Sequence, residues 1–300
     1  MQRKHKISNA LAPYAFLIPA ALIFVFLLLV PLGRAFYLST LKWDGIREPV
    51  QVGLQNFQNL FKDRIFLVAA RNTAIFVLSM VLIQSTVPLL VAVLLNSGIK
   101  GSTFFRTAYF MPVIISMAIS GMLWSMIYEP NFGVLNEMLR AVGLDKLTRF
   151  WLAEKWTVIP SLVLVSVWQS LGFYLVIYFA GLQNIPQELI EAAQIDGATP
   201  LRIFFKITIP LLAPVTTVVV VLNTINSLKV FDHVWVMTHG GPNNASTTFA
   251  TYLYQIAFGN MGSAESKLGY ASAIGLVIFI FTFILSILQV KYGQSEEIEY

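Results

Sequence analysis

The chain has 300 residues, of which 57% are hydrophobic and only 12% are charged, whereas soluble domains carry about 25% charged residues, so most of it does not face water. The net charge is +5, but only Arg3, Lys4 and Lys6 cluster, so no basic face for nucleic acid is built and nucleic-acid binding is excluded. Cysteine is absent, which excludes disulfides, iron–sulfur clusters and thiol catalysis.

Long apolar stretches dominate the chain. A hydrocarbon core about 30 Å thick needs about 20 apolar residues in a helix, because backbone groups find no water there. Six stretches qualify, and the predicted spans are residues 12–36, 72–96, 105–128, 157–182, 211–236 and 268–290. The predicted fold is therefore all-α and integral to the membrane. It forms a single transmembrane domain over residues 1–300 with both termini on one side.

The first predicted span follows a basic tail, so a cleaved signal peptide is an alternative. Its apolar stretch from Leu11 to Leu32 exceeds the usual core of about 7–15 residues, and no small-residue cleavage site follows. We expect it to remain as a span. Lys and Arg are divided about evenly between the two sides, so their totals leave the orientation open. The basic N-terminus favours the cytoplasm, because the first span usually dominates.

The connection between the fourth and fifth predicted spans, residues 184–210, has the pattern helix, glycine, helix. Residues 187–194 are mostly strong helix formers. Gly197 tolerates the left-handed conformation that ends many helices. Thr199 is a good N-cap and Pro200 suits the first position of a second helix. The sequence therefore predicts two short helices that meet at Gly197.

Part of this connection resembles a known motif. Glu191-Ala192-Ala193, three residues, Gly197, nine residues and Ile207-Thr208-Ile209-Pro210 resemble the EAA motif of ABC importer permeases. The family pattern usually ends I-x-L-P, so Ile209 replaces a leucine. In that family the loop is the coupling helix that seats in a groove of the cytoplasmic ATPase, which implies that the loop and both termini are cytoplasmic. The residues implied to contact the ATPase are Glu188, Glu191, Ala192, Ala193, Asp196 and Gly197.

A second resemblance follows the fifth predicted span. Phe231-Asp232 and the run from Met237 to Pro242, which includes Gly240-Gly241-Pro242, resemble the carbohydrate-uptake branch of the family, including maltose and glycerol-phosphate permeases. That branch more often has glycine where His239 stands. The resemblance implies one permease subunit of a sugar importer in the bacterial inner membrane. The substrate would be an oligosaccharide, a monosaccharide or a related polyol.

The resemblance also implies partners. They are a second homologous permease, two copies of a cytoplasmic ABC ATPase, an extracytoplasmic sugar-binding protein and the lipid bilayer. No G-x-x-x-x-G-K-[ST] phosphate loop occurs, and Ser97–Gly101 does not match it. ATP and Mg²⁺ would therefore be used by the partner ATPase, and no cofactor, metal site or catalytic residue is expected in this chain.

Polar and aromatic residues within the predicted spans are candidates to line a sugar pathway. Hydroxyl groups need amide and charged partners, and the C–H faces of sugars pack on aromatic rings. Intramembrane polar groups should face the bundle interior, although they can equally bond to a neighbouring helix, and aromatic residues can equally serve packing. Lys229 and Asp232 are three residues apart, a spacing that allows an ion pair. The candidates are Asn223, Asn226, Ser227, Lys229, Trp168, Gln169, Tyr174 and Trp124.

Two other classes of protein compete with this interpretation. An ion-coupled secondary transporter or channel would need intramembrane carboxylates or an inverted repeat, and Asp232 alone is weak support. A membrane enzyme would need a catalytic arrangement. The histidines are His5, His233 and His239, and no HExxH, serine-elbow or paired-carboxylate pattern appears.

Overall fold

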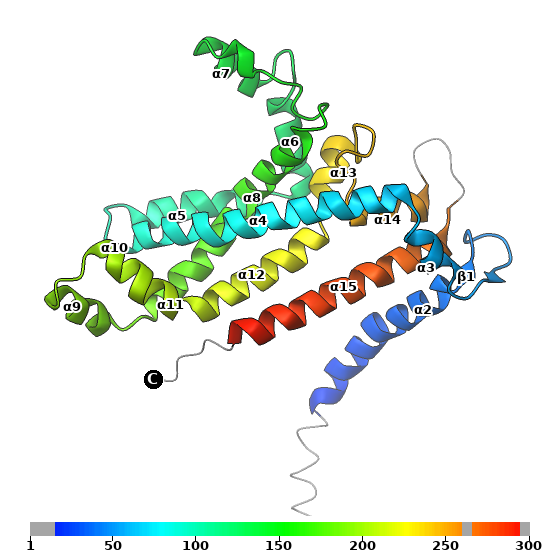
Figure 1. Cartoon of the computed structure of the whole chain (residues 1–300), viewed down its shortest axis with the longest axis horizontal. Helices are drawn as coiled ribbons and strands as arrows, with labels where there is room; N and C mark the ends of the chain where they lie inside the picture. The colour runs from blue at the N-terminus through cyan, green and yellow to red at the C-terminus, as the bar shows by residue number, and fades with distance from the viewer. Residues whose placement is uncertain (1–15, 260–265, 295–300) are drawn as a thin grey trace, which may run out of the picture. The chain divides into compact units, whose positions relative to one another are not determined.

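The computed structural model describes residues 16–259 and 266–294, which are mostly α-helical (Figure 1). The described residues divide into two compact units. The first unit contains residues 16–62 and 253–277 apart from 260–265, and the second contains residues 63–252 and 278–294. Residues 12–15 of the first predicted span lie outside the described residues.

The first unit opens with an apolar helix, Phe16–Ser39, which includes a π-helical turn at η1 (Val25–Leu29) and continues as α2 (Val30–Ser39). Residues 16–30 are all exposed. The whole helix has 24 residues, which is enough to cross the core of a bilayer. The helix is therefore a candidate membrane span by length and composition.

A short hairpin follows the first helix. Strand β1 (Leu41–Lys42) pairs antiparallel with β2 (Val50–Gln51). The chain then forms α3 (Gln55–Leu60), whose buried Asn56 donates from Nδ2 to the carbonyl oxygen of Ser39 at 2.8 Å. This bond ties the end of the first helix to α3.

The start of α15 (Leu268–Gln294) fits against the same hairpin in the first unit. A Cβ atom on Gly269 would lie only 1.9 Å from the carbonyl oxygen of Leu41. The Gly269 N–H donates to the Trp43 carbonyl oxygen at 3.2 Å. Glycine is thus required where the last predicted span begins, because any side chain would collide with backbone.

Three long helices form the core of the second unit: α4 (Arg64–Asn96), α8 (Val158–Gln183) and α12 (Ala213–Leu228). Helix α4 packs along both α8 and α12 (Figure 1). The buried side chains between the helices are mostly apolar and aromatic, and include Phe76, Met80, Leu89, Leu162, Val165, Tyr174, Tyr178 and Val219. The opposite face of α4 is also apolar but exposed, as expected of a helix in a bilayer.

Four described helices are long and apolar enough to span a membrane, and two bent helix pairs bring the number to as many as six. Helix α4, which contains the second predicted span, begins at Arg64, before residue 72. Arg64 and Arg71 interrupt the apolar pattern without interrupting the helix. Asp63 caps the helix, since its Oδ1 accepts from the Ile65 N–H at 2.9 Å.

The third predicted span, 105–128, is wrong as one continuous helix. It consists of α5 (Ser102–Phe110), η2 (Met111–Ile114) and α6 (Met117–Ile127), with a bend of 99°. Ile115 is extended, with ψ of 136°. Its freed carbonyl oxygen accepts a bond from Gln169 Nε2 at 2.7 Å. A side chain on α8 thus replaces the missing helical donor.

The fifth predicted span, 211–236, also differs. It begins within a continuous run of turns, α10 (Pro200–Ile203), η4 (Phe204–Thr208) and α11 (Ile209–Leu211), which meets α12 at a bend of 66°. Pro214 lies just beyond the bend, and a proline cannot continue a straight helix because it lacks an N–H and its ring collides with the preceding turn. Helix α12 ends at Leu228, and residues 232–238 form the separate helix α13 (Asp232–Thr238).

Candidate functional site

The predicted helix–glycine–helix loop is confirmed. Helix α9 (Gln187–Ile195) ends at Asp196, and Gly197 has a left-handed φ of +78°. Thr199 caps α10, since its Oγ1 accepts from the Arg202 N–H at 3.4 Å. Each turn-forming residue therefore stands where its conformational preference requires it.

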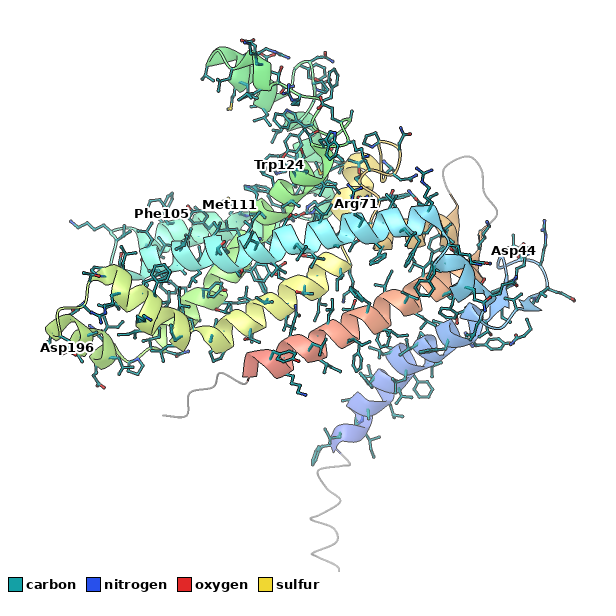
Figure 2. The ribbon with its side chains drawn as sticks, in the orientation of Figure 1. Asp44, Arg71, Phe105, Met111, Trp124 and Asp196 are labelled. Carbon is teal, nitrogen blue, oxygen red and sulfur yellow. The ribbon has the colours of Figure 1, made fainter. Side chains whose placement is uncertain are left out.

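The surface of this loop is solvent-exposed. Ala193 is half-buried, and the other five predicted coupling residues are exposed, namely Glu188, Glu191, Ala192, Asp196 and Gly197. Figure 2 shows Asp196 at the outer end of the loop. Ile195 beside it is 87% exposed. No ion pair forms to Glu188, Glu191 or Asp196 from any residue the structure describes. Acidic and apolar side chains together form an exposed surface on this loop. Such a surface is suited to contact with a partner protein.

Two polar candidates on α12 lie inside the bundle. Asn223 is 1% exposed, and its Nδ2 donates to the Met80 carbonyl oxygen on α4 at 3.2 Å. Its Oδ1 accepts from the hydroxyl of the buried Ser227 at 2.9 Å. The Nδ2 end of the Asn223 amide therefore links α12 to α4, and the Oδ1 end is satisfied within α12. Sugar lining by these two residues stays a prediction.

Asn226 and Lys229 are exposed. The Asn226 side chain interacts with the phenol group of the buried Tyr174 on α8. Lys229 forms no ion pair with Asp232, so that expectation was wrong. The physical reason is that α12 ends at Leu228 and a new helix begins at Asp232, so the two side chains do not share a helical face.

Two of the three predicted aromatic candidates, Trp124 and Trp168, lie in one cluster where α6 meets α8, and Tyr174 lies in another part of the core. The Trp124 ring lies 5.6 Å from the Trp168 ring, centroid to centroid, in an edge-to-face arrangement, and 5.3 Å from the Tyr128 ring. The Trp124 indole N–H is buried, with no hydrogen-bond partner among the residues described. Figure 2 labels this tryptophan. The cluster offers both aromatic faces and an unpaired donor.

Gln169, another candidate, belongs to a buried polar cluster that sequence reasoning missed. Its Oε1 lies 2.6 Å from His233 Nε2 and accepts from the Ser120 hydroxyl at 2.9 Å. His233 Nδ1 lies 3.0 Å from the Ser166 hydroxyl. Because an amide oxygen only accepts, the bond to Gln169 assigns a proton to His233 Nε2. His233 fell inside the predicted span 211–236, and an ionisable residue there was a signal that it faces the bundle interior.

We expect Gln169→Leu to lower the free energy of unfolding by about 1–3 kcal/mol, because it leaves buried groups on α6 and α13 and the Ile115 carbonyl without their partner. Thermal unfolding of the purified protein in detergent measures this loss. Ser125→Ala is the matched control, since the Ser125 hydroxyl bonds only to the Gly121 carbonyl of its own helix, at 2.9 Å. Equal unfolding temperatures for Gln169→Leu and the unmodified protein would contradict the assigned role.

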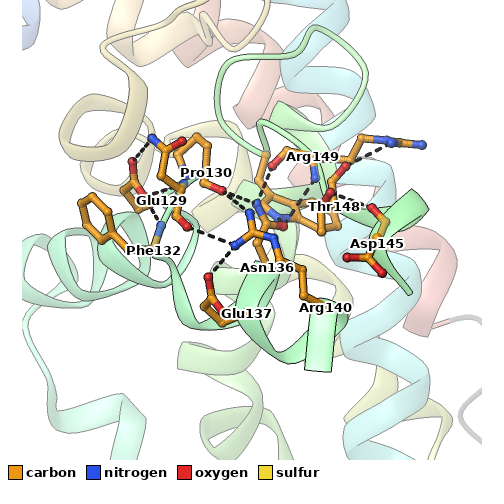
Figure 3. Close-up of polar contacts among 11 residues, drawn as sticks. Glu129, Pro130, Phe132, Asn136, Glu137, Arg140, Asp145, Thr148 and Arg149 are labelled. Atoms are coloured by element: carbon orange, nitrogen blue, oxygen red, sulfur yellow. Dashed lines mark hydrogen bonds and ion pairs between the residues drawn. The ribbon is translucent and has the colours of Figure 1, made fainter. Parts of the chain in front are cut away.

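The connection between α6 and α8 is held by its own side chains (Figure 3). The Glu129 carboxylate accepts from the N–H groups of Phe132 and Asn131, both at 2.7 Å. These backbone bonds, that to Phe132 first, lower the pKa of Glu129. Asn136 on α7 (Val134–Ala141) donates to the Pro130 carbonyl oxygen at 3.0 Å. The connection is therefore a preformed structure.

The sequence was compared with known proteins. Residues 2–295 match the family described as binding-protein-dependent transport system inner membrane component. The chain belongs to this permease family. It is 38% identical to the probable ABC transporter permease protein YurN of Bacillus subtilis, over 96% of this chain and 97% of that protein. It is 35% identical to the diacetylchitobiose uptake system permease protein NgcF of Streptomyces coelicolor, over 91% of this chain and 80% of that protein.

A solved structure of a bacterial ABC transporter agrees with the family assignment. The chain resembles a chain of a bacterial ABC transporter involved in the import of the acidic polysaccharide alginate, with a TM-score of 0.82 and 25% identity. The match covers 98% of this chain and 99% of that chain.

Membership of the permease family decides between the classes that the sequence left open. The protein is a multi-pass inner-membrane component of a binding-protein-dependent importer, a transport subunit and not an enzyme. Because of this family membership, an ion-coupled secondary transporter or channel is rejected as the main interpretation. None of the described candidate spans contains an aspartate or a glutamate, which is consistent with transport driven from outside this chain.

Proposed function

We propose that this permease imports a sugar, an oligosaccharide above all, and that ATP hydrolysis in a partner is coupled to transport through α9 and Gly197. The main support for this proposal is the exposed loop at α9. Its acidic residues form no ion pair within the part of the chain that the structure describes. One relative is named for the uptake of diacetylchitobiose, and the similar solved structure is named for the import of alginate. Both names support an oligosaccharide as the substrate.

The proposed assembly contains this chain, a second homologous permease, two copies of a cytoplasmic ABC ATPase and an extracytoplasmic sugar-binding protein. The two permeases would each form half of the pathway, and the exposed apolar faces of α4 and of residues 16–30 are available for the second permease and for lipid. The coupling loop and both termini would be cytoplasmic. ATP and Mg²⁺ would bind to the ATPase.

The sugar pathway would run along the polar and aromatic side chains of α6, α8 and α12. Trp124 and Trp168 supply aromatic faces for the C–H groups of a sugar ring. Asn226 and Lys229 are exposed and offer hydrogen-bond donors. Asn223, Ser227, Gln169 and Tyr174 stand behind this surface and hold it in place.

Reconstitution tests the proposed function. We expect this chain alone in proteoliposomes to hydrolyse no ATP, because it has no phosphate-binding loop. The complete assembly should hydrolyse ATP, and the sugar-loaded binding protein should stimulate that rate. A binding assay of the cognate binding protein across a panel of sugars identifies the substrate. Hydrolysis by the pure chain, or an assembly that takes up no member of the panel, would contradict the proposal.

A further inference from the structure

A pocket of about 680 Å³ lies within the second unit, at a place that the coupling loop does not involve. The start of α4 forms one wall, with Arg64, Arg71 and Asn72. Lys155, just before α8, forms another, and Asn243 and its neighbours in the turn after Gly240-Gly241 complete the lining. Three segments that are distant in sequence therefore converge on one cavity.

The pocket is positively charged. Arg64, Arg71 and Lys155 line it, and no aspartate or glutamate does. Arg64 and Arg71 are seven residues apart, which places them about two turns apart on one face of α4. None of the three cations has a carboxylate within ion-pair distance among the described residues. A concave site with charges of one sign concentrates the electrostatic potential and attracts anionic groups.

The turn that lines the pocket is fixed to α4. Asn72 is 4% exposed and donates from Nδ2 to the carbonyl oxygens of Asn244 and Thr247, both at 3.0 Å. One residue further along α4, Thr73 Oγ1 accepts from the Phe249 N–H at 3.0 Å. The turn therefore keeps its position beside Arg71 without a ligand, and little conformational entropy is lost when one binds.

The wall that carries Lys155 is fixed as well. The Thr157 hydroxyl donates to the Trp151 carbonyl oxygen at 2.9 Å. Glu154 is the acidic residue nearest to Lys155 in the sequence. Its carboxylate accepts a hydrogen bond from the Phe150 N–H at 3.1 Å. Glu154 is held toward Phe150 and does not line the pocket.

The pocket and the coupling loop lie at opposite ends of α8. Lys155 precedes the first residue of α8, Val158, by three positions, and α9 begins four residues after its last, Gln183. Helix α8 has 26 residues and is therefore about 39 Å long. If the coupling loop faces the cytoplasm, as the proposed function requires, the pocket opens on the outer side of the membrane.

We propose that this pocket receives acidic side chains of the sugar-binding protein that serves the importer. Charge complementarity favours carboxylates, the cavity is larger than a single ion needs, and the pocket opens on the side from which that protein arrives. The proposal rests on the proposed function. A neutral sugar would need acceptors as well as donors, whereas the charged groups here are all donors.

The double variant Arg64→Gln, Arg71→Gln tests the proposal in the complete assembly, held in nanodiscs of phosphatidylcholine. The affinity of the fluorescently labelled, sugar-loaded binding protein is expected to fall at least ~10-fold and to depend less on salt. Lys146→Gln is the control, because Lys146 is exposed on the same connection but does not line the pocket. An unchanged affinity, an equal loss in the control, or a loss seen only with anionic lipid would overturn the proposal.

A second measurement does not depend on the double variant folding. The chain has no cysteine, so Asn243→Cys introduces one reactive thiol at the exposed rim of the pocket. The sugar-loaded binding protein is expected to slow maleimide labelling of this thiol strongly, and to leave Lys146→Cys unaffected. Equal labelling with and without the binding protein would refute the pocket as its docking site. An unmodified assembly that the binding protein does not stimulate would instead refute the proposed function.

Discussion

Replacing Gly197 with valine is expected to reduce sugar uptake at least ~10-fold while the chain still inserts and assembles. Gly197 has φ of +78°, a conformation that costs a β-branched residue about 1–2 kcal/mol. A Cβ atom there meets nothing within 4 Å in this chain. The effect must therefore come from the changed direction of α10 relative to α9 and from contact with the ATPase, and not from a collision within the fold. Uptake and binding-protein-stimulated ATP hydrolysis in proteoliposomes measure it.

Gly98→Val is a matched control for this variant. Gly98 has φ of +81°, and a Cβ atom there also meets nothing within 4 Å. It lies in the connection between α4 and α5, outside the proposed coupling loop. Both variants carry the same backbone strain. We therefore expect transport to fall only in Gly197→Val, where the strain lies in the proposed coupling loop. Normal uptake by Gly197→Val, or equal losses in the two variants, would contradict the coupling role.

Gly172→Leu is expected to leave little folded protein in the membrane. A Cβ atom on Gly172 would lie 2.2 Å from the Tyr109 carbonyl oxygen and 2.6 Å from the Phe110 Cα. Both are backbone atoms, which cannot rotate away, so α8 and α5 must separate. Overpacking of this kind costs about 1–3 kcal/mol or more. The amount of protein that elutes as a monodisperse peak in detergent, and its unfolding temperature, report the loss.

Gly33→Leu is the control for Gly172→Leu, because Gly33 is also a helical glycine but nothing lies within 4 Å of its added Cβ atom. We expect this variant to fold normally. Gly172→Ala should be intermediate, since it adds only the colliding atom. A fully folded Gly172→Leu protein would show that α5 and α8 are not in the contact described here.

The sequence predicted those features that depend on neighbours along the chain. Apolar length predicted the long helices, and the conformational preferences of Gly197, Thr199 and Pro200 predicted the turn between α9 and α10. The charges of Arg64 and Arg71 concealed the first two turns of α4, because they break the apolar pattern, and in the fold both residues line a pocket. A charged residue is therefore a weak marker of where a helix begins.

Features that depend on residues distant in the chain could not be predicted. Asn223 bonds to Met80 across 143 positions, and Gln169 meets His233 across 64. No local sequence pattern encodes these long-range contacts. Polar residues that hold helices together were therefore grouped with exposed polar residues as candidates to line a pathway. The break at Ile115 has the same origin, because the extended residue is tolerated only where Gln169 supplies a donor.

The bend of 66° between α11 and α12 lies at Leu212, and in the proposed coupling mechanism it would act as the pivot of a lever. Helix α12 has 16 residues and is thus about 24 Å long, so a rotation of about 10° at this point displaces its far end by about 4 Å. The far end carries Asn226 and Lys229. If the loop moves as the proposed function requires, a small rotation at Leu212 would therefore reach Asn226 and Lys229 without unfolding any helix.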